Sequence, residues 1–242
     1  MLYGIAPVTH ALEARRRPLR RVYVKQGDPS PRLLRILDLA GGAGVPVEPV
    51  DAHVLAVRAE GKNHQGTVLE CGDLPTGDLR TWLARLGDAG ALVLALDRIE
   101  DPQNLGGLIR SAAFLGADAV LLHRGKRSPL SAAASKASAG TMESFPILEE
   151  PNLARALESI EQAGFFAYGA SLSPEAVDYR TQTPSARSVI VVGNEGDGLR
   201  ALTAKRCDVL VRIPGTGSVE SLNVNVAGGI LLSHFRSGGG PG

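Results

Sequence analysis

The sequence has little cysteine and no membrane-spanning pattern. Its 242 residues include two cysteines, Cys71 and Cys207, which form no Cys-x-x-Cys motif. We therefore expect no disulfide framework, but two reduced structural thiols in a cytoplasmic protein. No apolar stretch reaches the roughly 18 residues that a transmembrane helix needs. The first residues also lack the apolar core and the cleavage site of a signal peptide.

Signatures of metal sites and of serine hydrolases are also missing. The five histidines are His10, His53, His64, His123 and His234. None has the spacing to Cys, Asp or Glu that metal ligands show, so we expect no metal. No Gly-x-Ser-x-Gly motif is present, which argues against a hydrolase with a serine nucleophile. The net charge of +1 argues against a protein that binds polyanions over its whole surface.

One short segment nevertheless concentrates positive charge. Residues 15–25 contain no acidic side chain and these basic ones: Arg15, Arg16, Arg17, Arg20, Arg21 and Lys25. Such a cluster fits an RNA phosphate backbone. It fits equally well a solvated helix end followed by a surface turn at Pro18. Composition alone leaves both interpretations open.

The pattern of apolar residues predicts two α/β domains. Short helical and strand-like stretches alternate in residues 1–72, which predicts a small domain. Residues 73–90 combine Gly, Pro and Asp with a short amphipathic turn and are predicted to be a linker. Near-continuous apolar strands alternate with helices in residues 91–237, which predicts a parallel sheet covered on both faces. Residues 238–242 are predicted to be a disordered tail.

A first candidate site follows the predicted strand 91–96. The loop after this strand carries several polar residues, and Asn104 opens a predicted helix, 104–116. The apolar residues of that helix share one face, and Arg110 lies off this stripe. Because α/β proteins bind ligands at the carboxyl ends of parallel strands, Arg110 is a candidate ligand-binding group. The alternative is a surface arginine paired with an acidic residue.

A second candidate site is the glycine-rich segment after the predicted strand 188–192. Its sequence is Gly193-Asn194-Glu195-Gly196-Asp197-Gly198. Closely spaced glycines let a backbone approach a ligand with its N–H groups free to bond. A tight turn with a glycine bulge explains the same pattern.

A third candidate site lies near the C-terminus. Gly215 and Gly217 follow the predicted strand 208–213, and a helix is predicted from about residue 221. No lysine follows Gly217, which excludes a P-loop, and a third glycine and a later acidic residue are missing for a dinucleotide fingerprint. Two glycine loops at strand ends instead predict one ligand pocket.

Taken together, the three sites resemble the SpoU (TrmH-like) family of RNA ribose 2′-O-methyltransferases, in the SPOUT superfamily. Its three motifs resemble "DPQNLGGLIRSA" (101–112), "VVGNEGDGL" (191–199) and "IPGTGSVESLNVNVAGGILL" (213–232). "YGIAPVTHAL" (3–12) and "GKNHQG" (61–66) resemble the small substrate-binding domain of many members, which has a fold like that of a ribosomal protein. Within the family, the sequence most resembles enzymes that methylate a guanosine in 23S ribosomal RNA.

The resemblance implies a fold and an activity. It implies an α/β C-terminal domain with a parallel sheet and a deep trefoil knot, S-adenosyl-L-methionine as cofactor, and a homodimer. The implied reaction is 2′-O-methylation of a ribose in 23S ribosomal RNA, at a guanosine. A tRNA ribose methyltransferase of the same family and a non-catalytic RNA-binding protein on this fold are the alternatives. Residues 1–70 favour ribosomal RNA, because the tRNA enzymes commonly lack such a domain.

The resemblance also implies two sets of site residues. The catalytic and RNA-facing set is Asn104, Arg110, Glu195, Ser221 and Asn223. The cofactor-binding set is Gly193, Asn194, Gly198, Ile213, Gly217 and Leu222. In the family Arg110 is the proposed base, yet a guanidinium stays protonated in proteins. The alternative role for Arg110 is to hold an RNA phosphate with paired N–H groups.

Overall fold

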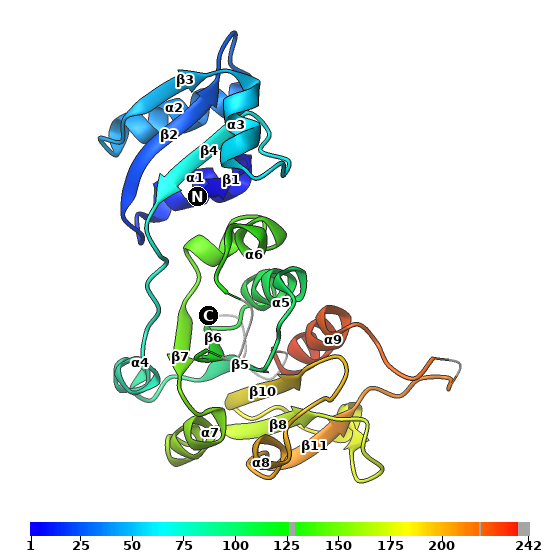
Figure 1. The fold of residues 1–242 in the computed structure, drawn as a ribbon. Helices are drawn as coiled ribbons and strands as arrows, with labels where there is room; N and C mark the ends of the chain where they lie inside the picture. Colours follow the sequence, from blue (N-terminus) through cyan, green and yellow to red (C-terminus); the bar gives the residue numbers. More distant parts are fainter. Residues whose placement is uncertain (126–128, 218, 237–242) are drawn as a thin grey trace. The chain divides into compact units, whose positions relative to one another are not determined.

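The computed structural model describes residues 1–125, 129–217 and 219–236, which form two compact units (Figure 1). The first unit contains Met1–Pro75 together with Pro129–Phe145. The second contains the described residues from Thr76 to Gly125 and from Pro146 onward. The predicted tail, 238–242, lies outside the described residues.

The first unit is built on a four-stranded sheet in the order β1-β4-β2-β3. Its strands are β1 (Leu2–Tyr3), β2 (Leu19–Lys25), β3 (Val47–Val50) and β4 (Thr67–Cys71). β2 runs antiparallel to β4 and parallel to β3. Because side chains alternate along a strand, Val22 and Val24 enter one apolar core and Tyr23 enters another.

The helices of the first unit are α1 (Ile5–Ala14), α2 (Pro31–Gly42), α3 (Ala52–Arg58) and α6 (Ala132–Ala137), with a short 3-10 helix, η1 (Thr141–Glu143). α2 begins where the side chain of Ser30 accepts the backbone N–H of Leu33, with Pro31 in the first turn. Apolar residues of α1 and α2 pack against the same core as Val22 and Val24. The alternation of helices and strands that the sequence predicts for this part of the chain is therefore present.

Residues 129–145 fold with the first unit, although they interrupt the second unit in sequence. Both α6 and η1 contact α1, and Ala132 packs against the core beneath α1 and α2. In the described chain, residues up to Pro75 and from Pro129 to Phe145 belong to the first unit, and residues from Thr76 to Gly125 and from Pro146 onward belong to the second. The sequence-based assignment of all residues from 91 to 237 to one domain does not anticipate this exchange.

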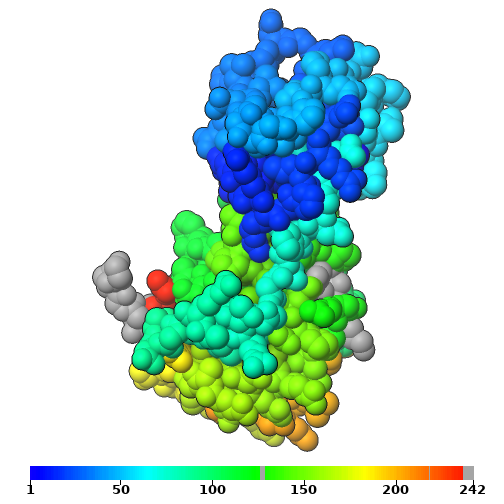
Figure 2. Space-filling view, turned by 90° about the vertical axis from the view of Figure 1, so that its left-hand side faces the viewer, coloured from blue at the N-terminus to red at the C-terminus, as the bar shows by residue number. Residues whose placement is uncertain are grey.

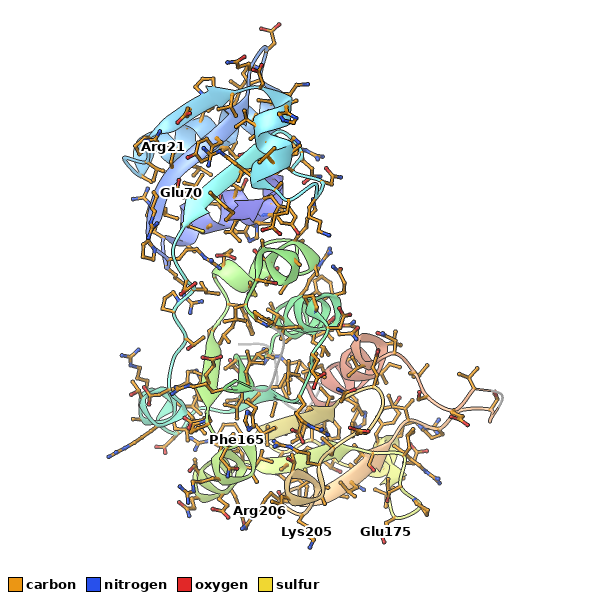
Figure 3. The ribbon with its side chains drawn as sticks, viewed as in Figure 1. Arg21, Glu70, Phe165, Glu175, Lys205 and Arg206 are labelled. Atoms are coloured by element: carbon orange, nitrogen blue, oxygen red, sulfur yellow. The ribbon has the colours of Figure 1, made fainter. Side chains whose placement is uncertain are left out.

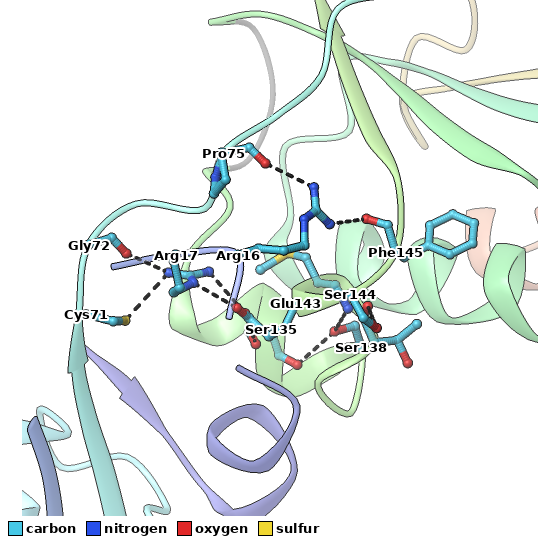
Figure 4. A network of polar contacts seen from close by, with 12 residues as sticks. Arg16, Arg17, Cys71, Gly72, Pro75, Ser135, Ser138, Glu143, Ser144 and Phe145 are labelled. Atoms are coloured by element: carbon cyan, nitrogen blue, oxygen red, sulfur yellow. Dashed lines mark hydrogen bonds and ion pairs between the residues drawn. The ribbon is translucent and has the colours of Figure 1, made fainter. Parts of the chain in front are cut away.

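A buried ion pair joins residues 129–145 to the rest of the first unit (Figure 4). Arg17 donates from Nε to Glu143 Oε2 at 2.7 Å and from Nη2 to Glu143 Oε1 at 3.0 Å. Glu143 also accepts a hydrogen bond from Ser135 Oγ at 2.7 Å, and Arg17 Nη1 donates to Gly72 O at 3.1 Å. The paired geometry and the additional hydrogen bonds offset the cost of burying both charges.

The second unit is built on a parallel sheet in the order β7-β6-β5-β10-β8-β11-β9. The strands are β5 (Ala91–Asp97), β6 (Ala119–His123), β7 (Ile147–Glu150), β8 (Phe166–Ala170), β9 (Val177–Asp178), β10 (Arg187–Gly193) and β11 (Val209–Arg212). The pairings found between these strands are all parallel. The parallel sheet predicted from the near-continuous apolar strands is confirmed.

Helices cover both faces of this sheet (Figure 1). α5 (Pro102–Phe114) and α9 (Val224–Arg236) pack together on one face. The other face carries α4 (Leu79–Leu86), α7 (Leu153–Gln162) and the short α8 (Ala201–Ala204), while η2 (Tyr179–Thr181) follows β9. Helices on both faces of the sheet were predicted from the sequence.

The predicted linker, residues 73–90, contains α4. The side chain of Asp78 accepts the N–H of Thr81 and caps this helix. Trp82, Leu83 and Leu86 pack against the core that α7 also covers, and Figure 2 shows α4 lying on the surface of the second unit. The amphipathic turn is thus a docked helix, because its apolar side is buried against the second unit.

The described residues include no helix that is long and apolar enough to cross a bilayer. Cys71 and Cys207 are free thiols. Burial raises the pKa of Cys71, and burial raises the pKa of Cys207 to about 12. Both thiols therefore stay protonated at neutral pH, which fits structural rather than reactive cysteines.

We expect Arg17→Ala to lower the free energy of unfolding by about 3–5 kcal/mol, because Glu143 is then left in a buried site without its partner. Arg20→Ala is the matched control. The Arg20 side chain is 66% exposed and its nearest carboxylate, on Glu70, lies 3.8 Å away. The control is expected to change the unfolding free energy by less than about 0.5 kcal/mol. Urea unfolding measures both variants, and equal effects would contradict the importance of the buried pair.

Candidate active site

The first two candidate sites meet because β5 and β10 are neighbours. In their parallel register Asp97, the last residue of β5, lies opposite Gly193, the last residue of β10. The order of strands reverses at this point: β6 and β7 lie beyond β5, while β8 and β11 lie beyond β10. Parallel sheets bind ligands in the crevice at such a reversal.

Buried hydrogen bonds hold the two loops together. The carboxylate of Asp97 is fully buried and accepts from Arg200 N at 3.0 Å and from Arg200 Nε at 2.7 Å. Asn194 Nδ2 donates to the carbonyl of Arg98 at 3.2 Å, and Arg98 Nη1 lies 3.5 Å from Asp197 Oδ2. Arg98 has a φ of 60°, which is uncommon for a residue with a side chain. The loop after β5 and the loop after β10 therefore form one fixed structure.

The glycine turn, residues 193–198, folds back on itself. Gly198 N donates to Asn194 O at 2.9 Å, and Gly196 N donates to Asn194 Oδ1 at 3.0 Å. A Cβ on Gly193 would overlap the carbonyl group of Gly198 and lie 2.5 Å from Leu199 N. Gly198 has a φ of +65°. Glycine at 193 is therefore required by the close backbone approach, and glycine at 198 suits the left-handed conformation.

Three residues from the three sequence motifs form one polar cluster. Asn223 Nδ2 donates to Glu195 Oε1 at 2.6 Å and to Asn104 Oδ1 at 3.3 Å. Glu195 Oε1 also accepts the backbone N–H of Val224 at 3.3 Å, at the start of α9. A carboxylate in this position is stabilised by the positive end of the helix dipole. The structure thus brings together Asn104, Glu195 and Asn223, as the resemblance implies.

The sequence around Asn104 explains its position. Asp101 caps α5 by accepting the N–H groups of Gln103 and Asn104, each at 3.2 Å, and Pro102 occupies the first turn. Asn104 is therefore fixed in the first turn of the helix, where it is 8% exposed. Its side chain faces the start of α9, through the hydrogen bonds to Asn223.

Arg110 lies further along the same helix, about 9 Å from Asn104 along the helix axis. It is exposed, and no hydrogen bond or ion pair joins it to any other described residue. The alternative interpretation, a surface arginine paired with an acid, therefore finds no support within the described chain. Arg110 presents its guanidinium to solvent on the unit that carries the polar cluster.

The segment between β11 and α9 joins this cluster only through its last residue, Asn223, among the hydrogen bonds of the described residues. Figure 1 shows it projecting away from the sheet, and its residues from Pro214 to Asn223 that are described are exposed. Leu222 is 49% exposed and Val219 is 73% exposed. Among the described residues, no hydrogen bond joins Ser221 to Asn104, Glu195 or Asn223. Within the described chain, no hydrogen bond joins Ile213, Gly217 or Leu222 to the glycine turn.

The last helix begins at Val224, later than the predicted start near residue 221. The side chain of Asn223 accepts the backbone N–H of Asn225 at 2.9 Å, as an N-terminal cap does. Asn225 also donates from Nδ2 to Asn104 Oδ1 at 2.8 Å. Sequence reasoning missed Asn225, although its place two residues after Asn223 was visible.

In the structure, some residues of the basic cluster 15–25 are buried and others are exposed. Arg17 is 7% exposed and its guanidinium is fully engaged, so its assignment to an RNA-facing surface is wrong for this conformation. Arg16 is half-buried, donates to Phe145 O and Pro75 O, and has a pKa lowered by burial. A sequence does not show which backbone carbonyls a side chain contacts, so this role of Arg16 was not predicted.

The remaining basic residues of that cluster are exposed. Arg15 donates to Gly42 O at 3.0 Å, while Lys25 lies at the end of β2. Arg20 lies 3.8 Å from Glu70, and Arg21 forms an ion pair with Glu48; Figure 3 labels Arg21 and Glu70 in the first unit. These pairs are accessible and weak, so Arg20, Arg21 and Lys25 stay available to an anionic partner.

Among the residues that the structure describes, no group of three His, Cys, Asp or Glu side chains is arranged to hold a metal ion.

Comparisons with known proteins identify the family. Residues 91–233 match the SpoU rRNA Methylase family, and residues 1–76 match a family described as RNA 2′-O ribose methyltransferase substrate binding. The 23S rRNA (guanosine-2′-O-)-methyltransferase RlmB of Vibrio cholerae is 37% identical over 237 residues, which cover 96% of this chain and 94% of that protein. The protein of the same name from Pseudomonas aeruginosa is 34% identical over 233 residues, which cover 96% of this chain and 93% of that protein.

Solved structures agree with these sequence matches. The crystal structure of an AdoMet-bound rRNA methyltransferase from Sinorhizobium meliloti has a TM-score of 0.79 and 28% identity, and the match covers 97% of this chain and 85% of that chain. A crystal structure described as an RNA 2′-O ribose methyltransferase has a TM-score of 0.80 and 26% identity, covering 98% and 87%. The chain belongs to the SpoU rRNA methylase family.

Proposed function

We propose that this protein transfers a methyl group from S-adenosyl-L-methionine to the 2′-hydroxyl of a guanosine ribose in 23S ribosomal RNA, in the cytoplasm. Relatives named for this reaction match nearly the whole chain. The observation that carries the proposal is the polar cluster of Asn104, Glu195 and Asn223 beside the glycine turn. Methyl transfer requires the ribose hydroxyl and the cofactor to lie next to each other, and a polar cluster beside a glycine turn can hold both.

The glycine turn fits the cofactor. At Gly193 the backbone comes so close to Gly198 that no side chain is tolerated, which makes a cradle of backbone atoms. Val219 and Leu222 are exposed apolar side chains on the segment before α9, and covering an adenosyl group removes such surface from water. We assign the cofactor to the residues of these two segments that the family resemblance implies: Gly193, Asn194, Gly198, Ile213, Gly217 and Leu222. In this proposal the segment folds over the turn when the cofactor binds.

The chain's own residues orient the ribose and manage its proton. When bound, S-adenosyl-L-methionine supplies a methyl group that the adjacent sulfonium charge already activates. A ribose hydroxyl must lie in line with that group, so that its oxygen bonds the methyl carbon as the carbon–sulfur bond breaks, and its proton must pass to a base or to water. Glu195 holds the side chain of Asn223 and the first N–H of α9 in place. Ser221 and Asn223 are the residues that we assign to the hydroxyl.

Arg110 has two possible roles in this mechanism. An arginine guanidinium carries a positive charge and N–H groups in a fork that matches a phosphate. Arg110 is exposed and has no acidic partner among the described residues. We therefore assign it to an RNA phosphate next to the reacting ribose, with removal of the hydroxyl proton as the alternative.

We further propose a homodimer and the trefoil knot of the family. On α5 and α9, Phe114 is 88% exposed and Val226 is 50% exposed, and a hollow of about 590 Å³ beside Val226 also contacts Tyr179 and His234. Apolar surface of this kind is typical of a face covered by a second copy. A monomer in equilibrium sedimentation would contradict the dimer.

A cofactor-bound structure with an unknotted trace through residues 191–236 would contradict the knot.

The proposed activity is tested with radioactive methyl transfer from S-adenosyl-L-methionine to 23S ribosomal RNA and to tRNA. We expect label in ribose of 23S RNA. Arg110→Ala is expected to lower kcat/KM by at least about 100-fold, while the affinity for the cofactor stays unchanged. Label in tRNA instead would overturn the assigned substrate. Arg110→Lys keeps a phosphate contact, so near-wild-type turnover of this variant would refute the base role.

Gly193→Ala is expected to weaken binding of S-adenosyl-L-methionine by about 10-fold or more, because the added methyl group pushes the turn open. Gly196→Ala is the matched control, since the nearest atom to its added Cβ is Asn194 Oδ1 at 3.8 Å. Titration calorimetry measures both affinities, and unfolding curves show whether each variant is folded. Similar affinities for the two folded variants would remove the glycine turn from the cofactor site.

The RNA contact of the first unit is tested through the salt dependence of binding. Replacing Arg20, Arg21 and Lys25 together by Gln is expected to reduce the slope of log K against log salt concentration by about 1–2. Arg35→Gln is the control, since the Arg35 side chain is 66% exposed and lies on α2. A slope unchanged in the triple variant would assign the cluster to a solvated surface.

A further inference from the structure

We propose that Asn225 is a positioning residue for the methyl transfer: it fixes the carboxamide of Asn104 so that the Asn104 amide nitrogen faces the substrate. The kinetic part of this inference rests on the proposed function. Its geometric part rests on the contacts of α5 with Asn223 and with the start of α9.

The hydrogen bonds of Asn104 are divided between its two polar atoms. Asn104 Oδ1 accepts from Asn225 Nδ2 at 2.8 Å and from Asn223 Nδ2 at 3.3 Å, which uses both of its acceptor positions. No described residue accepts a hydrogen bond from Asn104 Nδ2, and this nitrogen is not one of the fully buried atoms that lack a partner. Both N–H groups of the Asn104 amide thus lack a partner among the described residues, and the nitrogen is not fully buried.

Asn225 makes the shorter of the two bonds that set this orientation. Asn223 lies closer to Glu195, at 2.6 Å, than to Asn104, at 3.3 Å. Asn225 has no comparable second acceptor among the described residues for its side-chain nitrogen. Without the Asn225 donor, the Asn104 carboxamide is free to turn over and to present its oxygen outward.

Gly107 makes room for this contact. A Cβ on Gly107 of α5 would overlap Asn225 Oδ1 and would lie 2.8 Å from Asn225 Cγ. The carboxamide of Asn225 therefore occupies the space that a side chain at position 107 would need. Because its carboxamide is packed against the backbone of α5 at Gly107, Asn225 has little freedom to move.

The arrangement is costly for stability. Asn225 Oδ1 is buried and has no hydrogen-bond partner among the described residues. A buried acceptor without a partner loses its interaction with water and gains nothing in return. An apolar or smaller side chain would avoid this loss, so stability alone does not explain an asparagine here. The bond to Asn104 does explain it.

The test compares variants that differ by single groups. Asn225→Ala removes the donor, and Gly107→Ala displaces the donor. The double variant Gly107→Ala with Asn225→Ser removes the overlap and keeps a hydroxyl that donates to Asn104 through a water molecule. The double variant Gly107→Ala with Asn225→Ala is the same apart from that hydroxyl. Gly41→Ala on α2 is the control, since its added Cβ meets no atom within 4 Å.

We expect kcat to fall by about 10-fold in Asn225→Ala and in Gly107→Ala, with KM for RNA and for the cofactor within about twofold of wild type. The serine double variant is expected to return to within about threefold of the wild-type kcat. The alanine double variant is expected to stay slow. Gly41→Ala is expected to match wild type.

Different outcomes would overturn different parts of the inference. Equal kcat in the two double variants, or an Asn225→Ala variant as fast as wild type, would show that Asn225 only packs against α5. A wild-type protein that transfers no methyl group would overturn the proposed function and the kinetic role of Asn225 with it. The unfolding midpoints of the same variants can be measured without substrate. If the changes in midpoint at positions 107 and 225 simply add in the double variants, the proposed overlap between a side chain at 107 and Asn225 is wrong.

Discussion

The pairing of β5 with β10 is the constraint on which the site depends. It places Asp97 opposite Gly193 and so joins loops that are far apart in the sequence. The buried carboxylate of Asp97 then binds the backbone and the side chain of Arg200, 103 residues away. A buried carboxylate must be compensated by hydrogen bonds, so the two loops have little freedom relative to each other. The positions of the glycine turn and of the polar cluster both depend on the hydrogen bonds between Asp97 and Arg200.

The parts of the fold that follow from local patterns were predictable. The apolar run that ends at Asp97 is β5, and the stripe of apolar residues after Asn104 is α5, because burial on both faces or on one face leaves a periodic signal. The place of residues 129–145 was not predictable. It depends on the ion pair between Arg17 and Glu143, which are 126 residues apart. A run of arginines looks the same in sequence whether its members meet RNA or a buried glutamate.

The candidate site shows the same division. The motif resemblance named Asn104, Glu195 and Asn223, which the structure brings together. It gave no reason to name Asn225, because an asparagine near a helix start has an ordinary explanation as a capping residue. The hydrogen bond to Asn104 and the lack of a side chain on Gly107 appear only when α5 and α9 are packed together. Long-range packing, which one sequence does not display, determines this part.

The site combines a fixed half with an exposed half. Asn104, Glu195 and Asn223 are held by hydrogen bonds to one another, which fixes the orientation of these polar groups. The segment before α9 carries Val219 and Leu222 in water. In the proposed function, burying these side chains over the cofactor provides free energy that offsets the loss of conformational freedom in the segment. Cofactor binding would then be coupled to completion of the site, while the polar cluster stays in place before and after.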